Sequence, residues 1–230
     1  MHELSPMRIA IAAATAREMD AIRQPTPPGS AGQGPLRLSY WTTGVGLLHA
    51  THALTARIRA ERPGLVLQVG IGGAFDTVRH PVGSAACLAR DGVADLGVRE
   101  ADGWRDVFEM GLTDPDTHPY RGGWLVNPHD RLLTRSGLAA ATGVTVNRVS
   151  TDRDWIGDLE RRLRPDIESM EGAALHYVCL MESVPFLQIR GVSNRVGERD
   201  KSAWQIAAAL DSAAAALHRL LAILPENGHA

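Results

Sequence analysis

Short apolar runs recur along the chain, and stretches with helical periodicity separate them. Runs of this length with few charges are typical of strands that are buried on both faces of a sheet. We therefore predict strands at residues 8–14, 36–42, 64–69, 82–89, 144–149 and 186–190. Strands that alternate with helices favour an α/β sandwich around a mixed or parallel sheet, in which ligands bind at the carboxyl ends of the strands.

Three helices are predicted in the first two thirds of the chain. A helix start follows the first strand at residues 15–23, and Leu47, Leu54 and Ile58 recur with helical spacing. The charged stretch at residues 152–164 is typical of a helix that faces solvent.

Two further helices are predicted near the carboxyl end. The first of them should bury one face, made of Met170, Ala173, Ala174, Tyr177, Val178 and Met181. Ser202 and Gln205 have the spacing of a capping box for the last helix. Its predicted buried side carries Ile206, Leu210, Ala213, Leu217 and Leu221.

Two stretches fit neither kind of element. Residues 25–35 are rich in Pro and Gly and predict a surface loop. Residues 91–123 mix Gly, Pro, Asp and aromatics without periodicity, and we expect a long functional loop with at most one short helix. Because the 230 residues show no evident linker, we predict a single domain over residues 1–230, with residues 1–6 as a disordered extension.

The composition narrows the classes of partner. Apolar residues make up 44% of the chain and charged residues 22%, with a formal net charge of -2, so there is no broad basic surface for a nucleic acid or an anionic membrane. Small molecules are the expected ligands. Cys87 and Cys179 lie in apolar runs, which indicates buried free thiols and a cytoplasmic protein. Residues 1–10 lack the features of a signal peptide or a membrane anchor.

A glycine-rich segment, Gly70 to Gly73, directly follows the strand at residues 64–69. Missing side chains allow a backbone to approach a ligand closely, so we predict that Ile71 and Gly72 line a pocket. A dinucleotide fingerprint is excluded, because residues 76–81 leave no room for the helix that GxGxxG must open. GxxxxGK[ST], GxSxG and HExxH motifs are absent and the nine His residues are scattered, so neither a cofactor nor a metal is predicted.

Polar residues stand where several of the predicted strands end. Glu18 follows the first strand, Glu171 opens a helix, and Ser193 and Asn194 follow the strand at residues 186–190. A doubly wound sheet can bring these points together in one pocket. Each residue also has a structural explanation, since a Glu in a first helical turn stabilises the helix dipole and an Asn after a strand often forms a turn.

Resemblance to a known family favours the functional explanation. Residues 167–178 (IESMEGAALHYV), residues 184–194 (VPFLQIRGVSN), the GIGGAF segment and the Glu18 region resemble the nucleoside phosphorylase and nucleosidase superfamily, especially the methylthioadenosine nucleosidases, over nearly the whole chain. The resemblance implies a nucleoside phosphorylase-like α/β/α sandwich with a central mixed sheet. It also implies a homo-oligomer, a dimer or larger.

Two further segments resemble one branch of that superfamily. Residues 93–104 (VADLGVREADGW) and 191–204 (GVSNRVGERDKSAW) are similar to the futalosine hydrolases, which remove hypoxanthine from futalosine on a route to menaquinone. The expected substrate is thus a 6-oxopurine nucleoside, and the expected reaction is cleavage of its N-glycosidic bond by water.

The resemblance also implies roles for individual residues. Glu171 matches the family's ribose-binding glutamate, close to the positive charge that develops on the sugar, and Met170 matches its partner packed against the sugar. Glu18 matches the glutamate that activates water. A carboxylate at that place would repel a phosphate dianion, so Glu18 favours hydrolysis over phosphorolysis, an argument that the neighbouring Arg17 weakens.

Asn194 departs from the pattern of the methylthioadenosine nucleosidases, which carry an aspartic acid there. An amide cannot give up a proton at useful pH, but it can donate a hydrogen bond to N7 or O6 of a 6-oxopurine. Asn194 therefore predicts hypoxanthine or guanine over adenine, with Ser193 orienting the amide. Trp155 and Phe108 are predicted to stack on the base.

Three hypotheses follow. The first is a cofactor-free purine nucleosidase with Glu18 and Asn194 as catalytic residues. The second is a 6-oxopurine nucleoside phosphorylase of the same fold, and the third is a non-catalytic nucleoside-binding protein on the same scaffold.

Overall fold

The computed structural model describes residues 7–23, 36–101 and 103–224, so the loop predicted at residues 25–35 and the extension predicted at residues 1–6 lie outside the described residues. The strands are β1 (Met7–Ala13), β2 (Leu36–Thr42), β3 (Leu65–Ala74), β4 (Ala85–Asp91), β5 (Gly97–Glu100), β6 (Gly103–Asp106), β7 (Leu125–Val126), β8 (Ala139–Thr145), β9 (Ile167–Ser169) and β10 (Phe186–Arg195). The helices are α1 (Ala16–Arg23), α2 (Leu47–Glu61), α3 (Asp130–Arg135), α4 (Arg153–Leu163), α5 (Gly172–Met181) and α6 (Ile206–Ile223), with a 3₁₀ turn at Lys201–Ala203.

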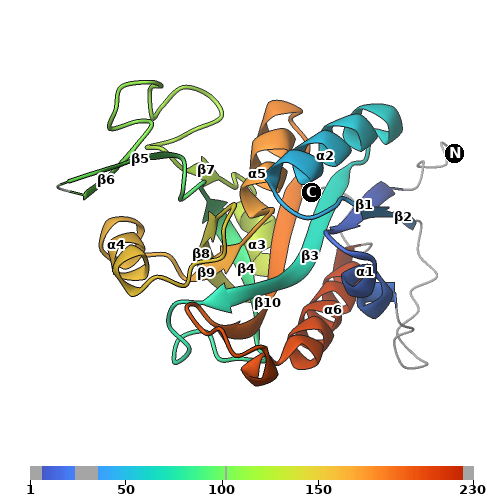
Figure 1. The fold of residues 1–230 in the computed structure, drawn as a ribbon. Coiled ribbons are helices and arrows are strands. Elements are labelled where there is room, and N and C mark those ends of the chain that lie inside the picture. Colours follow the sequence, from blue (N-terminus) through green and yellow to red (C-terminus); the bar gives the residue numbers. More distant parts are fainter. Residues whose placement is uncertain (1–6, 24–35, 102, 225–230) are drawn as a thin grey trace, which may run out of the picture.

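Eight of these strands form one mixed sheet (Figure 1). Its order is β2-β1-β3-β9-β8-β4-β10, with β7 attached to β4. Strand β10 also pairs along β3, so the path through β9, β8 and β4 returns to its start and this part of the sheet closes on itself. The β3–β9 and β4–β10 pairs are antiparallel and the β1–β2, β1–β3 and β3–β10 pairs are parallel, which confirms the predicted α/β fold with a mixed sheet.

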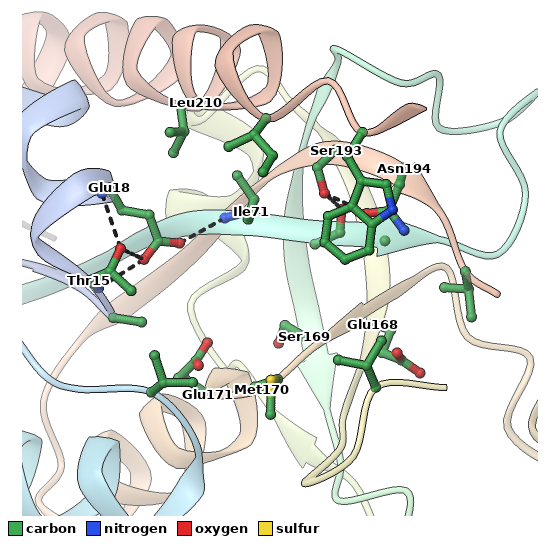
Figure 2. A pocket seen from close by; sticks show the side chains of 18 of the residues that line it. Thr15, Glu18, Ile71, Glu168, Ser169, Met170, Glu171, Ser193, Asn194 and Leu210 are labelled. Carbon is green, nitrogen blue, oxygen red and sulfur yellow. Dashed lines mark hydrogen bonds between the residues drawn. The ribbon is translucent and has the colours of Figure 1, made fainter. Parts of the chain in front are cut away.

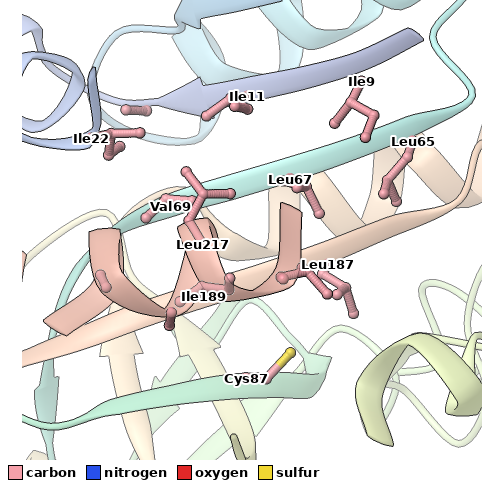
Figure 3. Close-up of a cluster of buried hydrophobic side chains, with 14 of the residues drawn as sticks. Ile9, Ile11, Ile22, Leu65, Leu67, Val69, Cys87, Leu187, Ile189 and Leu217 are labelled. Carbon is pink, nitrogen blue, oxygen red and sulfur yellow. The ribbon is translucent and has the colours of Figure 1, made fainter. Parts of the chain in front are cut away.

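Alternation along the strands distributes the core over both faces of the sheet. Ile9 and Ile11 of β1 pack with α1 and α6 in the cluster of Figure 3, whereas Ala10 and Ala12 point to α2 and α5 on the other face. Successive side chains of a strand point to opposite faces, so a strand without charges can be buried on both. The result is the predicted α/β/α sandwich.

Helix α6 and the turn before it are long and apolar enough, by length and composition, to cross a membrane. In this fold, however, Ala213, Leu217 and Leu220 lie fully or almost fully buried in the core cluster that contains residues of β3 and β10. The apolar composition of α6 is accounted for by its position in the core.

Several predicted boundaries were wrong. The Gly70 to Gly73 segment does not follow the strand but lies within the second half of β3, and residues 167–169 form the short strand β9. Strand β8 begins at Ala139 rather than Val144, because its alanines have little of the β-branched character by which strands are recognised. Within residues 91–123 the described part forms the β5–β6 hairpin and turns rather than a short helix.

Two helical predictions also need correction. In α5 the predicted face includes Tyr177 and Met181, but these are 37% and 48% exposed, while Leu175 and Cys179 are buried. The helix is apolar on nearly all sides, so periodicity could not select its face. The capping box at Ser202 is absent: Asp200 accepts hydrogen bonds from the Ser202 N–H and hydroxyl, and Ser202 belongs to the 3₁₀ turn before α6.

Candidate active site

The neighbour of β3 changes along one of its edges. Strand β1 pairs with residues 65–68, and β9 pairs only with Gly73 and Ala74. Between these two stretches a cavity of about 270 Å³ opens onto β3 (Figure 2). In α/β proteins, ligands often bind at such points, where the strands on either side of a crevice run apart. Seven of the predicted site residues, taken from strand ends, the glycine segment and the family resemblance, line the cavity: Glu18, Ile71, Gly72, Met170, Glu171, Ser193 and Asn194.

Glu18 is held at the edge of β3 by three donors. It is the third residue of α1, and Thr15 precedes the helix as its N-cap, so the two form a capping box. Glu18 Oε2 accepts from the Thr15 N–H at 2.9 Å and from the Thr15 hydroxyl at 2.8 Å, while Oε1 accepts from the Ile71 N–H at 3.3 Å. The carboxylate, only 8% exposed, thus has a fixed orientation on the cavity wall.

Glu171 lies on the opposite side of the cavity in Figure 2. It precedes the first residue of α5, and its Oε1 accepts from the Gly46 N–H at 3.1 Å. Met170, the preceding residue, also lines the cavity. The pair therefore presents a carboxylate and an apolar thioether next to each other on the cavity wall.

Arg190 contacts Glu171 and lies near Glu18, and it was not predicted as a site residue from the sequence. Its Nη1 lies 3.6 Å from Glu171 Oε2, and its Nη2 donates to Gln68 Oε1 at 2.8 Å. An ideal Cβ on Gly70 would stand 2.6 Å from Arg190 Nη1 and 2.8 Å from Glu18 Oε1, so the guanidinium also lies close to Glu18. The signal in the sequence is a charged residue within the apolar run at residues 186–192, since a buried Arg requires partners.

Asn194 is fixed at the other end of the cavity. Its Nδ2 donates to the Arg195 carbonyl at 2.8 Å, and its Oδ1 accepts from the Ser193 hydroxyl at 2.7 Å. Because a carbonyl can only accept, the nitrogen must be on the Arg195 side, and the orientation of the amide is determined. The second proton of Nδ2 is left for a ligand, and Ser193 orients the amide as expected.

The two aromatic residues expected to stack on a base are elsewhere. Trp155 packs edge-on against Trp104, with ring centroids 5.0 Å apart, in a core cluster beside β8. Phe108 packs against Tyr120 within the loop between β6 and β7, with ring centroids 5.2 Å apart. Neither lines the cavity, so this part of the prediction was wrong for the described chain. The indole that does line it is Trp204, at the turn before α6.

The described residues contain no group of three or more His, Cys, Asp or Glu side chains that could hold a metal ion. The polar side chains that line the cavity are carboxylates, the Asn194 amide, hydroxyls and the guanidinium of Arg17, and the buried Arg190 lies 3.6 Å from Glu171. Carboxylates, a thioether and an amide at the switch point of a partly closed mixed sheet are the groups that the resemblance to nucleoside phosphorylases and nucleosidases leads us to expect.

Solved structures share this fold at low sequence identity. A 5′-methylthioadenosine/S-adenosyl homocysteine nucleosidase of Helicobacter pylori matches with a TM-score of 0.78 and 14% identity over 95% of this chain and 99% of that one. A structure of the futalosine hydrolase of Helicobacter pylori matches with a TM-score of 0.77 and 15% identity over 94% and 97% of the two chains.

No family model matches the chain. Individual sequence relatives, however, identify one family within the class. The futalosine hydrolase of Thermus thermophilus is 32% identical in an alignment of 193 positions that covers 80% of each chain. That of Streptomyces coelicolor is 31% identical in an alignment of 247 positions, gaps included, that covers 95% of this chain and 97% of its own. The chain belongs to the futalosine hydrolase family, which confirms the resemblance drawn from its motifs.

Proposed function

We propose that this protein hydrolyses the N-glycosidic bond of futalosine, with water adding to the ribose carbon and hypoxanthine leaving. The observation that carries the proposal is the Glu18 carboxylate, which three hydrogen bonds orient at the cavity wall close to Arg190. Membership of the futalosine hydrolase family supports the choice of substrate.

Bond cleavage is assigned to the Glu171 side of the cavity. As the bond to the base lengthens, positive charge develops on the ribose, and a carboxylate at the sugar hydroxyls stabilises it. Arg190 and the Gly46 N–H fix the two oxygens of Glu171, so little reorganisation is needed when the charge appears. Met170 is assigned to the apolar face of the sugar.

Water activation is assigned to Glu18. Water must lose a proton as it attacks, and a positioned base contributes typically 10²–10⁴-fold to the rate of such a step. Arg190 is assigned a positioning role, because its Nη1 lies 3.6 Å from Glu171 Oε2 and the guanidinium is near Glu18.

Departure of the base is assigned to the Asn194 end. The purine leaves with excess negative charge, which the free N–H of Asn194 can stabilise at N7 or O6. An amide donates a hydrogen bond without transferring its proton, so the leaving hypoxanthine takes its proton from solvent.

Charge in the cavity disfavours the phosphorylase alternative. Among the described residues that line it are three carboxylates, Glu18, Glu168 and Glu171, and one cationic side chain, Arg17. A phosphate dianion beside Glu18 would be repelled. Membership of the futalosine hydrolase family also does not support the third hypothesis, a non-catalytic nucleoside-binding protein.

The test is hypoxanthine release from futalosine in phosphate-free buffer and with added phosphate. We expect equal rates, and the same insensitivity to phosphate in any slower reaction with inosine. A strict requirement for phosphate would identify a phosphorylase. Absence of turnover in both buffers, with base binding retained, would favour a binding protein.

We further propose that the protein is a homo-oligomer. Large apolar side chains are exposed on α2, on α5 and in the loop after β6: Leu48 is 86%, Leu112 68% and Met181 48% exposed. Light scattering coupled to size exclusion should give a multiple of the chain mass, and Leu48→Glu should lower it. A monomeric wild-type protein would contradict this proposal.

A cytoplasmic location and a role in menaquinone formation complete the proposal. Cys87 and Cys179 are buried free thiols, as a reducing compartment permits. Deletion of the gene should make growth depend on added menaquinone, and unaffected growth without it would argue against this role.

A further inference from the structure

One tryptophan, Trp204, lies at the cavity and has no place in the hydrophobic core. The other four, Trp41, Trp104, Trp124 and Trp155, each belong to a core cluster or pack against one. Trp204 is partly exposed and, within the described residues, has neither a core cluster nor another aromatic ring as a partner. It is also the only aromatic among the described residues that line the cavity. An apolar ring that stands at a pocket without a packing partner is available to a ligand.

Backbone hydrogen bonds place Trp204 at the Asn194 end of the cavity. Gln205 follows Trp204 in the chain, and its N–H donates to the Ser193 carbonyl at 2.8 Å. Asn194 is the next residue of β10. Ser193 and Asn194 lie together at the end of the cavity away from Glu18 (Figure 2). The turn before α6 therefore brings the indole to the part of the cavity where Asn194 is assigned to the base.

The indole nitrogen of Trp204 is already bonded. Its Nε1 donates to the Glu198 carbonyl at 3.2 Å. The Glu198 N–H donates to the Arg195 carbonyl at 3.1 Å, so the acceptor is itself held in a turn that follows β10. An indole nitrogen can only donate, and with this bond made the side chain offers a ligand only the carbons of its ring. Trp204 is thus suited to apolar and stacking contacts rather than to hydrogen bonding.

We propose that Trp204 binds the purine of the substrate by stacking its indole on the base, while Asn194 contacts the polar edge of the same base. The inference rests on the proposed function, because that function places a purine at the Asn194 end of the cavity. A bound base needs a donor for its edge and an apolar surface for its ring. Asn194 of β10 supplies the first, and the turn tied to Ser193 supplies the second.

The two contacts have different consequences for recognition. Every base has a π face, so stacking on an aromatic ring is largely independent of the groups on the edge of the base. Hydrogen bonds to N7 and O6, in contrast, depend on those groups. Trp204 therefore contributes affinity for the purine ring as such, and Asn194 determines which purine is preferred.

Trp204→Leu and Trp204→Phe form a matched pair of variants. Both lose the hydrogen bond to the Glu198 carbonyl and both keep an apolar side chain, but only Trp204→Phe keeps a flat aromatic ring. Because Trp204 lies outside the core clusters, neither change opens a cavity in the core. A difference between the two variants therefore reports stacking and not the geometry of the turn.

The experiment is calorimetric titration of wild type, Trp204→Leu and Trp204→Phe with free hypoxanthine. Stacking of a base on an aromatic side chain corresponds to about 10- to 100-fold in affinity, and we expect Trp204→Leu to bind hypoxanthine more weakly by this factor. Trp204→Phe should stay within about threefold of wild type, because a ring remains for the base. No binding of hypoxanthine by wild type, equal affinities in all three proteins, or equal losses in the two variants would overturn the proposal.

Intrinsic fluorescence gives a second readout. Of the five tryptophans only Trp204 lines the cavity as described, so a base stacked on it should quench its emission. We expect hypoxanthine to quench the fluorescence of wild type but not that of Trp204→Phe, although this variant still binds the base. Quenching of equal size in both proteins would overturn the stacking contact. Both measurements use the free base, so their outcome does not depend on whether futalosine is hydrolysed, and the assay with and without phosphate tests the proposed function separately.

Discussion

Gly70→Ala should disable the reaction while leaving the fold intact. Its new methyl group would stand 2.6 Å from Arg190 Nη1 and 2.8 Å from Glu18 Oε1, whereas ordinary contacts begin at 3.4 Å. To restore a contact of 3.4 Å with a methyl group that stays in place, the guanidinium would have to move by about 0.8 Å and the carboxylate by about 0.6 Å. Both obstructing atoms are ends of side chains, so the strand can stay in register while the two groups shift. A misplacement of this size costs about 10²-fold in rate.

The assay is kcat/KM for hypoxanthine release, with thermal unfolding and hypoxanthine affinity measured on the same samples. We expect kcat/KM to fall about 10²-fold, Tm to change by a few degrees and hypoxanthine affinity to stay constant, because Asn194 lies at the other end of the cavity. Gly64→Ala is the control, since its Cβ would meet nothing closer than 3.7 Å. Full activity in a correctly folded Gly70→Ala protein would refute the assigned arrangement of Glu18 and Arg190.

Three further predictions concern single side chains. Glu18→Gln should lower kcat by about 10²–10⁴-fold with hypoxanthine binding retained, and near-normal turnover would exclude Glu18 as the base. Asn194→Asp should shift kcat/KM ratios from 6-oxopurine towards 6-aminopurine nucleosides, because it replaces the donor facing the base; unchanged ratios would show that Asn194 does not contact the base. Burial raises the pKa of Asp91 from 3.8 to about 6, so this group favours folding below pH 4 and loses that contribution as pH rises through 6. Wild type should therefore gain about 2 kcal/mol relative to Asp91→Asn between pH 7 and pH 4, measured by denaturant unfolding, and parallel pH profiles would contradict this.

The order of the major helices and strands followed from the sequence because several of the long strands are runs rich in apolar residues. Strand β2 was predicted to the residue, and β1 and α1 to within one residue. Where the pattern is weaker, the prediction failed: β7 has two residues, β9 has three, and β8 is rich in alanine. That residues 1–230 form a single domain stays a prediction.

The site was predictable as far as strand ends could indicate it. Glu18 lies in the helix after β1, Glu171 follows β9 by two residues and Asn194 is the last residue but one of β10, and the structure brings all three to one cavity. Arg190 and Glu168 were missed because they lie within strands, where sequence reasoning expects core residues. Only the register of β3 with β9 and β10 shows which face they share.

Glu18 also supplies the hydrogen-bond acceptor that a neighbouring strand would have given to the backbone of β3. Its carboxylate accepts from the Ile71 N–H where β1 no longer pairs, and it caps α1 through Thr15. Removing it would leave a buried backbone donor unsatisfied, at a cost of about 1–3 kcal/mol, in addition to the lost cap. Selection for folding alone would therefore retain this glutamate in a descendant that had lost its activity. Its presence in a distant relative is, by itself, no proof of hydrolysis there, whereas its replacement would be strong evidence that the reaction has been abandoned.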